Sequence, residues 1–365
     1  MSELTQIAAA DFSRLFAENI PLIDTRAPVE FTQGAFPNAD SLPLMSDDQR
    51  TLVGTCYKNH GQQAAINLGH KLLQESGKQQ RVDGWIKFIK KHPNGAIYCF
   101  RGGLRSQISQ QWIFDKSGID YPRITGGYKA LRRFLLDETD RIMGQITPII
   151  IGGQTGCGKT LLLDKLQNKI DLEALANHRG SAFGNTTTKQ PTQINFENSL
   201  AIALIKQQKS VLLFEDEGAN VGTVHIPKCV QAKTAGAKLI LLEATLEQRL
   251  EVSMDAYVVN MQKDFKAQDG ENGFDNFANY WLESLQKIQK RLGLERYKSL
   301  LIMVNDALTR YQKQGDNSGF YPVIETLLID YYDPMYDYQI QKKMDRVVFK
   351  GDSDAILHYL KDKVK

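Results

Sequence analysis

The stretch Gly153-Gln154-Thr155-Gly156-Cys157-Gly158-Lys159-Thr160 decides the fold of the second half of this 365-residue chain. It follows an apolar run at 149–151 and precedes a helical pattern that begins near Thr160. The spacing G-x-x-x-x-G-K-[ST] is that of the P-loop, whose backbone N–H groups wrap a phosphate chain at a helix N-terminus. Because strand, loop and helix occur in the order that the motif needs, we predict a phosphate site in a doubly wound α/β domain.

The residues of this loop have separate predicted roles in binding a diphosphate. Gly153, Gly156 and Gly158 let the backbone approach the phosphate oxygens closely. Lys159 is expected to neutralise the terminal phosphate, and the Thr160 hydroxyl is expected to reach a magnesium ion. These five residues form the predicted diphosphate site.

An acidic cluster, Glu215-Asp216-Glu217, follows a second apolar run at 211–214. Parallel strands deliver the residues after them to one sheet edge, and P-loop proteins hold their metal with an acid placed there. We therefore predict Mg²⁺ as a cofactor, with Thr160, Glu215 and Asp216 as its ligands. A solvated acidic turn is the alternative, because adjacent acids are common at strand ends.

The spacing of apolar residues divides the chain into two α/β domains with parallel sheets. We predict a first domain over 1–136, a linker over 137–147, and the P-loop domain with a mainly helical C-terminal part over 148–365. In the first domain, strands are predicted at 21–24 and 96–99, and helices at 62–76, 83–91, 106–116 and 129–141. In the second, strands are predicted at 148–152, 210–215, 238–243 and 346–349, and helices from 159 and at 193–208, 246–263, 274–292 and 353–361.

Composition excludes several classes of protein. Apolar residues make up 42% and charged residues 24%, which excludes a disordered, collagen-like or coiled-coil chain. No apolar run approaches the ~18 residues that span a bilayer, and no export signal is readable, so we predict a cytoplasmic protein without a membrane partner. The four cysteines form no C-x-x-C pair. Lys and Arg outnumber Asp and Glu by 17 to 12 over 1–136, an excess that permits nucleic-acid binding without indicating it.

A cysteine at a strand end forms the second predicted chemical centre, in the stretch Cys99-Phe100-Arg101-Gly102-Gly103-Leu104-Arg105-Ser106. A loop of this kind aims N–H groups and a helix N-terminus at the sulfur, which lowers the pKa of a thiol and binds an anion. Gly102 and Gly103 allow the backbone to turn, and Arg101 and Arg105 add positive charge suited to an oxyanion. A buried, unreactive strand cysteine is the alternative.

Further motifs surround this loop, at Ile23-Asp24-Thr25-Arg26, Glu30-Phe31, 34–39 and Gly126-Gly127-Tyr128. With the Cys99 loop they resemble a rhodanese domain over most of 8–136. The resemblance implies that Cys99 carries a chalcogen as a persulfide or its selenium counterpart, and that Asp24 helps to hold the domain together. Five residues separate Cys99 from Arg105, as in cysteine phosphatases of the same fold, whereas sulfur-transferring members have a shorter loop. The longer loop implies a wider cradle for a phosphate-like ligand.

Other stretches relate both halves to one family, namely 54–58, Gly61, Leu68-Gly69, 180–184, 215–217, Val221-Gly222 and 330–336. With the two loops they resemble bacterial tRNA 2-selenouridine synthases over nearly the whole chain. The resemblance implies a transferase that replaces the 2-thio group of the tRNA wobble uridine (U34) with selenium from selenophosphate. It also implies an S-geranyl-2-thiouridine intermediate made from geranyl diphosphate, and tRNAs for Lys, Glu and Gln as partners.

The resemblance implies that Cys99 receives selenium and that the P-loop binds the diphosphate of the prenyl donor. It also implies that selenophosphate is bound by Arg101, Gly102, Gly103 and Arg105. Contacts to tRNA are indicated only weakly. Lys129, Arg132 and Arg133 could contact backbone phosphates, but solvated charges are the preferred interpretation. The tyrosines of 331–338 could stack on a base, although packing is preferred. We expect a monomer.

Three other functions fit parts of the sequence. A rhodanese-fold cysteine phosphatase fused to a P-loop NTPase accounts for the Cys-x5-Arg spacing and would hydrolyse aryl phosphates. A sulfurtransferase fused to a P-loop NTPase would need persulfide turnover and nucleotide affinity. A regulatory binding module with a degenerate rhodanese domain is disfavoured, because Cys99 and both arginines are retained.

Overall fold

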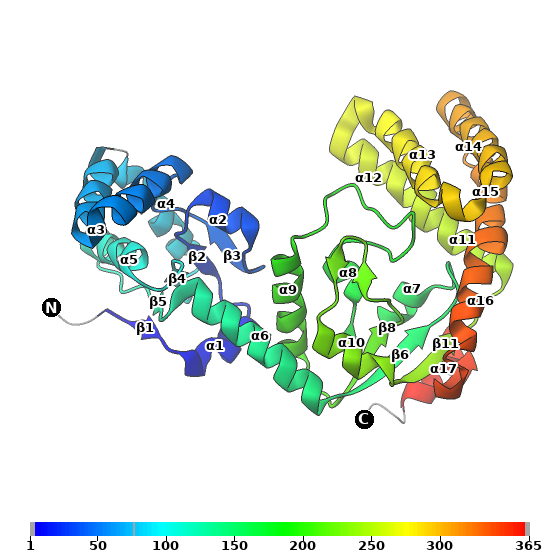
Figure 1. Cartoon of the computed structure of the whole chain (residues 1–365), viewed down its shortest axis with the longest axis horizontal. Coiled ribbons are helices and arrows are strands. Elements are labelled where there is room, and N and C mark those ends of the chain that lie inside the picture. The colour runs from blue at the N-terminus through cyan, green and yellow to red at the C-terminus, as the bar shows by residue number, and fades with distance from the viewer. Residues whose placement is uncertain (1–3, 76, 362–365) are drawn as a thin grey trace. The chain divides into compact units, whose positions relative to one another are not determined.

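A computed structural model describes residues 4–75 and 77–361, which form two compact units. Unit 1 extends to Ile142 and includes Thr192–Gln208, and unit 2 comprises Met143–Pro191 and the chain from Lys209 onward. Three predicted ranges extend beyond the described residues: the first domain at 1–3, the helix 62–76 at residue 76, and the P-loop domain at 362–365. Both units contain a parallel sheet with helices, which confirms the predicted α/β class (Figure 1).

The sheet of unit 1 has the strand order β1-β5-β4-β2-β3, and every pairing is parallel. Its strands are β1 (Gln6–Ile7), β2 (Leu22–Asp24), β3 (Ala39–Ser41), β4 (Ala96–Tyr98) and β5 (Arg123–Ile124). The helices of this unit are α1 (Phe12–Ala17), α2 (Pro28–Gln33), α3 (Asp47–Glu75), α4 (Lys78–Lys91), α5 (Leu104–Ser117), α6 (Gly127–Gln145) and α9 (Gln193–Lys206).

Helices cover both faces of this sheet. Leu22 packs with Phe12 of α1 in one apolar core, whereas its neighbour Ile23 packs with Trp85 of α4 in another, because successive strand residues point to opposite faces. A strand that is buried on both faces has consecutive apolar residues in its sequence. This pattern is why β2 and β4 could be predicted from the sequence. The carboxyl end of β4 leads directly into the Cys99 loop.

Helix α9 departs from the predicted domain division, since we assigned 193–208 to the P-loop domain. The helix instead belongs to unit 1, where Asn198 Nδ2 donates to the Ala35 carbonyl at 2.8 Å and Asn195 Oδ1 accepts from the Ala35 N–H at 2.7 Å. Its Ile202 joins the core that contains Phe12. Periodicity identifies a helix and its apolar stripe, but it does not say which sheet the stripe covers.

The sheet of unit 2 has the order β12-β11-β6-β8-β7, again with only parallel pairings. Its strands are β6 (Thr147–Gly152), β7 (Lys169–Ile170), β8 (Val211–Glu215), β11 (Lys238–Leu242) and β12 (Val347–Gly351), beside a hairpin of β9 (Asn220–Val221) and β10 (Val224–His225). Helix α6 runs on to Gln145 and β6 begins at Thr147, so 137–147 is helix and strand and not a separate linker.

Helices α7 (Lys159–Leu163) and α17 (Ser353–Lys361) cover one face of this sheet through Leu162 and Ile356. Helix α8 (Leu172–Ala176) contacts β8, and α10 (Lys228–Ala235) contacts β6. Strands β6 and β8 are neighbours, and Ile151 is in register with Glu215. The P-loop and the acidic cluster therefore follow adjacent strand ends, as predicted.

The C-terminal helices pack around aromatic side chains, which include Phe277, Trp281 and Phe320. They are α11 (Leu246–Met254), α12 (Asn260–Asp269), α13 (Gly273–Leu292), α14 (Leu294–Gln314), α15 (Phe320–Leu327) and α16 (Asp333–Gln341), yellow to orange-red in Figure 1. Tyr331 and Tyr332 are buried in this core, which confirms the packing interpretation for them. Within the described residues, none of the helices is apolar over a stretch long enough to traverse a bilayer.

Candidate active site

Cys99 follows β4, and its sulfur lies at the start of α5. The side chain is 3% exposed. The Ser106 Oγ atom lies 3.1 Å from Cys99 Sγ and 3.1 Å from the Gly103 carbonyl oxygen, so its single proton can be donated to only one of them at a time. The Gly103 carbonyl oxygen is 3.7 Å from the sulfur. The sulfur is therefore buried, and its polar neighbours are the Ser106 hydroxyl and the Gly103 carbonyl.

Glycines let two loops pack against each other at this centre. Gly102 has φ +66°, and a Cβ there would lie 2.7 Å from the Gly126 nitrogen. Gly127 has φ +60°, and a Cβ there would lie 2.2 Å from the Cys99 carbonyl oxygen. The Tyr128 N–H donates to that same carbonyl at 2.9 Å. The Gly126-Gly127-Tyr128 motif thus braces the cysteine loop, and larger residues at these two φ values would be strained.

The two predicted arginines differ in their surroundings. Arg105 donates from Nη1 and Nη2 to the Glu30 carboxylate at 2.6 and 3.2 Å. Burial alone would lower the pKa of Arg105, but the hydrogen bonds and charge of Glu30, together with the nearby Cys99, raise it. Burial would raise the pKa of Glu30, yet Arg105 lowers it, so both side chains stay charged. Arg101 is exposed. Of the two predicted arginines, the structure thus fixes only Arg105 near the sulfur.

A buried ion pair supports the strand that ends at Cys99. The Arg26 Nη2 atom lies 2.6 Å from Asp24 Oδ2, and both side chains are almost fully buried. The Tyr98 hydroxyl donates to the same Asp24 oxygen at 2.8 Å. Removing one partner of such a pair typically costs about 3–5 kcal/mol, because the other charge is left buried. These contacts agree with the structural role that the rhodanese resemblance implies for Asp24.

The P-loop of unit 2 is tightly enclosed. Gly156 has φ +80°, and a Cβ there would lie 2.5 Å from Ser253 Oγ and 2.7 Å from the Arg249 carbonyl oxygen. A Cβ at Gly153 would lie 2.5 Å from Cys157 Sγ, so the Cys157 side chain fills the space inside the loop. The Lys159 ammonium donates to the Gly153 carbonyl at 2.8 Å. The lysine therefore lies folded over the loop that is predicted to receive a diphosphate.

Two residues from the helical part brace this loop. Arg249 of α11 donates from Nε to the Thr155 carbonyl at 2.9 Å and from Nη1 to Gln154 Oε1 at 3.1 Å. Its guanidinium also pairs with both carboxylate oxygens of Asp333, at 3.0 and 2.5 Å. Asp333 belongs to the 330–336 stretch on which the family resemblance rests. The C-terminal helices thereby help to set the shape of the phosphate loop.

Three glutamates gather near Lys159. Glu215 is 2% exposed, and its Oε2 accepts the Glu173 N–H at 3.0 Å. Glu173 and Glu217 hydrogen-bond to each other, in the space that the missing Cβ of Gly180 leaves open. Burial, followed by repulsion among the carboxylates, raises the pKa of Glu173 and Glu215 to about 8 and that of Glu217 to about 7. Because Glu215 is buried and Glu173 and Glu217 are half-buried, a solvated acidic turn does not describe these groups.

The magnesium prediction fits part of this arrangement. Among the described residues, no group of three or more His, Cys, Asp or Glu side chains is placed to hold a metal ion. Mg²⁺ at a diphosphate needs only one or two protein oxygens, because phosphates and water supply the rest. Thr160 is exposed at the start of α7, and Glu215 Oε1 is buried with no hydrogen-bond partner among the described atoms. Asp216 instead pairs with Lys343 at 2.6 Å, so Thr160 and Glu215 fit the ion better.

The shared burial of these carboxyl groups predicts a pH-dependent stability. Their pKa values are raised from an ordinary 4.5, so between about pH 4.5 and 8 the folded chain holds protons that the unfolded chain releases. Stability should therefore fall as the pH rises through this range. In Glu217→Gln, the free energy of unfolding should fall by about 1–3 kcal/mol less over this pH range than in the wild type, because an amide cannot ionise.

Urea unfolding of the full chain at several pH values measures this slope. The matched control is Glu251→Gln, which changes an exposed glutamate on α11 and should leave the slope of the wild type intact. Equal slopes for Glu217→Gln and the wild type would contradict the argument.

Comparison with known proteins decides the family. A sequence profile described as the tRNA 2-selenouridine synthase AAA domain matches residues 146–365. A protein from Pseudomonas fluorescens named tRNA 2-selenouridine synthase is 47% identical over 97% of this chain and 98% of its own. The protein of that name from Hahella chejuensis is 48% identical over 96% of this chain and 93% of its own. The chain belongs to the tRNA 2-selenouridine synthase family. Membership confirms the family identified from the sequence and makes the chain an enzyme of the transferase class.

A solved structure resembles a smaller part of this family member. The N-terminal domain of a protein from Clostridium difficile 630, described as ATP/GTP binding, is 27% identical and covers 36% of this chain and 99% of its own. Its TM-score of 0.33 is too low for the likeness to bear on the fold.

The weakly indicated tRNA contacts differ in their surroundings. Arg132 is not a free surface charge, because it pairs with Glu197 and donates to Asn198 Oδ1, both on α9. Arg133 is exposed and pairs with Asp137 on its own helix, as a solvated charge does. Lys129 is exposed. Of these three residues, Lys129 and Arg133 therefore remain exposed enough to contact tRNA phosphates.

Proposed function

We propose that this chain converts 2-thiouridine at the tRNA wobble position to 2-selenouridine in two steps, through S-geranyl-2-thiouridine. Two arrangements in one chain support the proposal, namely a buried sulfur near a fixed arginine and a P-loop with a lysine folded over it, and we interpret each as an anion site. Relatives that share one name cover both sites, which favours this function over a phosphatase or sulfurtransferase fusion.

Geranyl transfer is assigned to the P-loop. The thiocarbonyl sulfur attacks the first carbon of geranyl diphosphate, the C–O bond breaks as the C–S bond forms, diphosphate leaves and the base loses its N3 proton. Lys159 and the loop amides would bind the departing diphosphate, whose charge they stabilise. Mg²⁺, held by Thr160 and Glu215, would supply further neutralisation of the same charge.

Selenium transfer is assigned to Cys99. Alkylation turns the sulfur into a good leaving group. The selenium of selenophosphate would then attack C2, the C2–S bond would break as geranyl thiolate leaves, and water would take the phosphoryl group from selenium as phosphate, so that no atom is oxidised or reduced. Cys99 would contact the selenium atom of selenophosphate. Arg105 and the Gly102-Gly103 backbone would bind the phosphate group of the same donor. Arg101 is exposed and can join them from the loop. The acceptors would be cytoplasmic tRNAs for Lys, Glu and Gln, acted on by a monomer.

Omission of each co-substrate tests this scheme. The full chain is incubated with 2-thiouridine tRNA, geranyl diphosphate and selenophosphate, and the wobble nucleosides are analysed by mass. Without selenophosphate, S-geranyl-2-thiouridine should accumulate, and without geranyl diphosphate, 2-thiouridine should persist. Formation of 2-selenouridine in the absence of geranyl diphosphate would refute the two-step order.

A further inference from the structure

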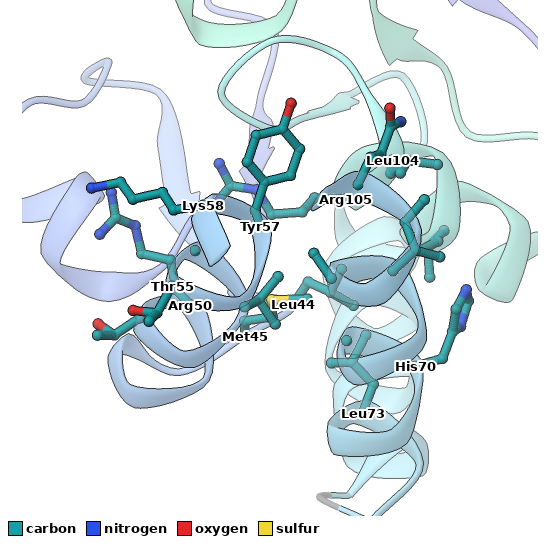
Figure 2. Close-up of a pocket in the computed structure, with 18 residues that line it drawn as sticks. Leu44, Met45, Arg50, Thr55, Tyr57, Lys58, His70, Leu73, Leu104 and Arg105 are labelled. Carbon is teal, nitrogen blue, oxygen red and sulfur yellow. The ribbon is translucent and has the colours of Figure 1, made fainter. Parts of the chain in front are cut away.

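A cavity of about 570 Å³ lies in unit 1, between the two halves of α3 and the first turns of α5. The halves are separate helices because Gly61, with φ +82°, takes a left-handed conformation that interrupts the helix. Figure 2 shows Leu44 and Met45 between the two halves, with Tyr57 above them in the view. The volume falls within the ~300–1,000 Å³ of typical small-molecule sites.

The interior of this cavity is apolar, whereas part of its edge is cationic. Buried apolar side chains line the inside, namely Leu44, Met45, Ala65 and Leu73. Tyr57 and Leu104 also line it and are 56% and 46% exposed, so apolar surface continues out to the opening. Arg50 and Lys58 lie at the outer edge in Figure 2, where they can neutralise phosphates. This combination fits a hydrocarbon chain attached to a polyanion.

One helical turn connects the cavity with the reactive sulfur. Leu104 and Arg105 line the cavity, and the next residue, Ser106, has its hydroxyl 3.1 Å from Cys99 Sγ. The ion pair with Glu30 fixes Arg105 between the two. A chain bound in the cavity would therefore have its attached group beside the Cys99 loop.

We propose that this cavity binds the geranyl chain of the S-geranylated wobble uridine and so presents the C2 atom of the base to selenium at Cys99. The inference rests on the proposed function, which supplies the alkylated intermediate, and it adds a second prenyl site distinct from the P-loop. The alkyl group then serves as a recognition handle as well as a leaving group. The edge cations contact the phosphates on either side of the base.

Filling the cavity tests the assignment. An added Cβ at Gly54, which lines the cavity, would meet no atom within 4 Å, so Gly54→Leu starts a larger side chain in open space at the cavity wall. Gly84 of α4 has equally open surroundings but does not line the cavity, which makes Gly84→Leu the matched control. The full-length proteins are given selenophosphate and tRNA that carries either S-geranyl- or S-methyl-2-thiouridine, and 2-selenouridine formation is timed.

The ratio of the two rates is the readout. The wild type and Gly84→Leu should convert the S-geranyl substrate at least about tenfold faster, whereas Gly54→Leu should lose most of that preference. Equal rates for both substrates in the wild type, or an unchanged preference in Gly54→Leu, would overturn the cavity assignment and leave the proposed function standing. If the wild type converts neither alkylated substrate but does convert 2-thiouridine tRNA, the proposed intermediate itself fails, and the inference fails with it.

Discussion

Cys99→Ala should abolish selenium incorporation, by at least about a thousandfold, while S-geranyl-2-thiouridine accumulates in tRNA. The reason is that the two proposed steps use different units of the chain: the sulfur lies in the loop of unit 1, and the P-loop proposed to bind diphosphate follows a strand of unit 2. Mass analysis of wobble nucleosides after incubation with all three substrates measures both products at once.

Cys56→Ala is the matched control, since Cys56 is a half-buried free cysteine of the same unit and should be dispensable. If Cys99→Ala makes neither product, the cysteine serves both steps or maintains the fold. If the variant still makes 2-selenouridine, the assignment of selenium chemistry to Cys99 is wrong.

Lys159→Ala should slow geranyl transfer by roughly 10²–10³-fold, the usual effect of removing one group that stabilises developing negative charge. Burial alone would lower the pKa of Lys159, but the nearby Cys157 and the carboxyl groups of Glu173, Glu217 and Glu215 raise it. The lysine therefore stays cationic and available to a diphosphate. Formation of S-geranyl-2-thiouridine from 2-thiouridine tRNA, without selenophosphate, isolates this step.

The same variant should keep its selenium chemistry on tRNA that is already geranylated. Lys165→Ala, which removes an exposed lysine shortly after the loop, is the control and should transfer geranyl groups normally. Normal geranyl transfer by Lys159→Ala would move the prenyl donor away from the P-loop.

Strong local patterns made much of the fold predictable. Strands β6, β8 and β11 contain apolar runs of three or four residues, and α13 is a long amphipathic helix, so each has a clear local signal. Strands β1, β5 and β7 contain two residues each, too few for any period. The place of α9 in unit 1 depends on hydrogen bonds between residues about 160 positions apart, which a local pattern does not contain.

The site was predictable where its residues are adjacent in sequence. The Cys99 loop and the P-loop each lie within one short stretch. Their partners come from elsewhere: Glu30 holds Arg105, Arg249 braces the P-loop, and Glu173 joins the acidic cluster. For two of these partners the sequence held a signal, because Glu30 and Asp333 belong to stretches that carry the family resemblances. The motifs alone did not show that these acids pair with arginines at the two centres.

The central claim is that two separate sites in one chain perform consecutive reactions on the same nucleotide. This division of the reaction can be tested by complementation between two variants, of which Cys99→Ala is impaired in selenium transfer and Lys159→Ala in geranyl transfer. Purified Cys99→Ala first geranylates 2-thiouridine tRNA, which is then repurified and given to Lys159→Ala with selenophosphate and no prenyl donor. We expect 2-selenouridine from the pair in this order, and at most the slow residual amount from either variant acting alone on 2-thiouridine tRNA. Failure of Lys159→Ala to convert the geranylated tRNA, while the wild type converts it, would contradict the division of labour between the two sites.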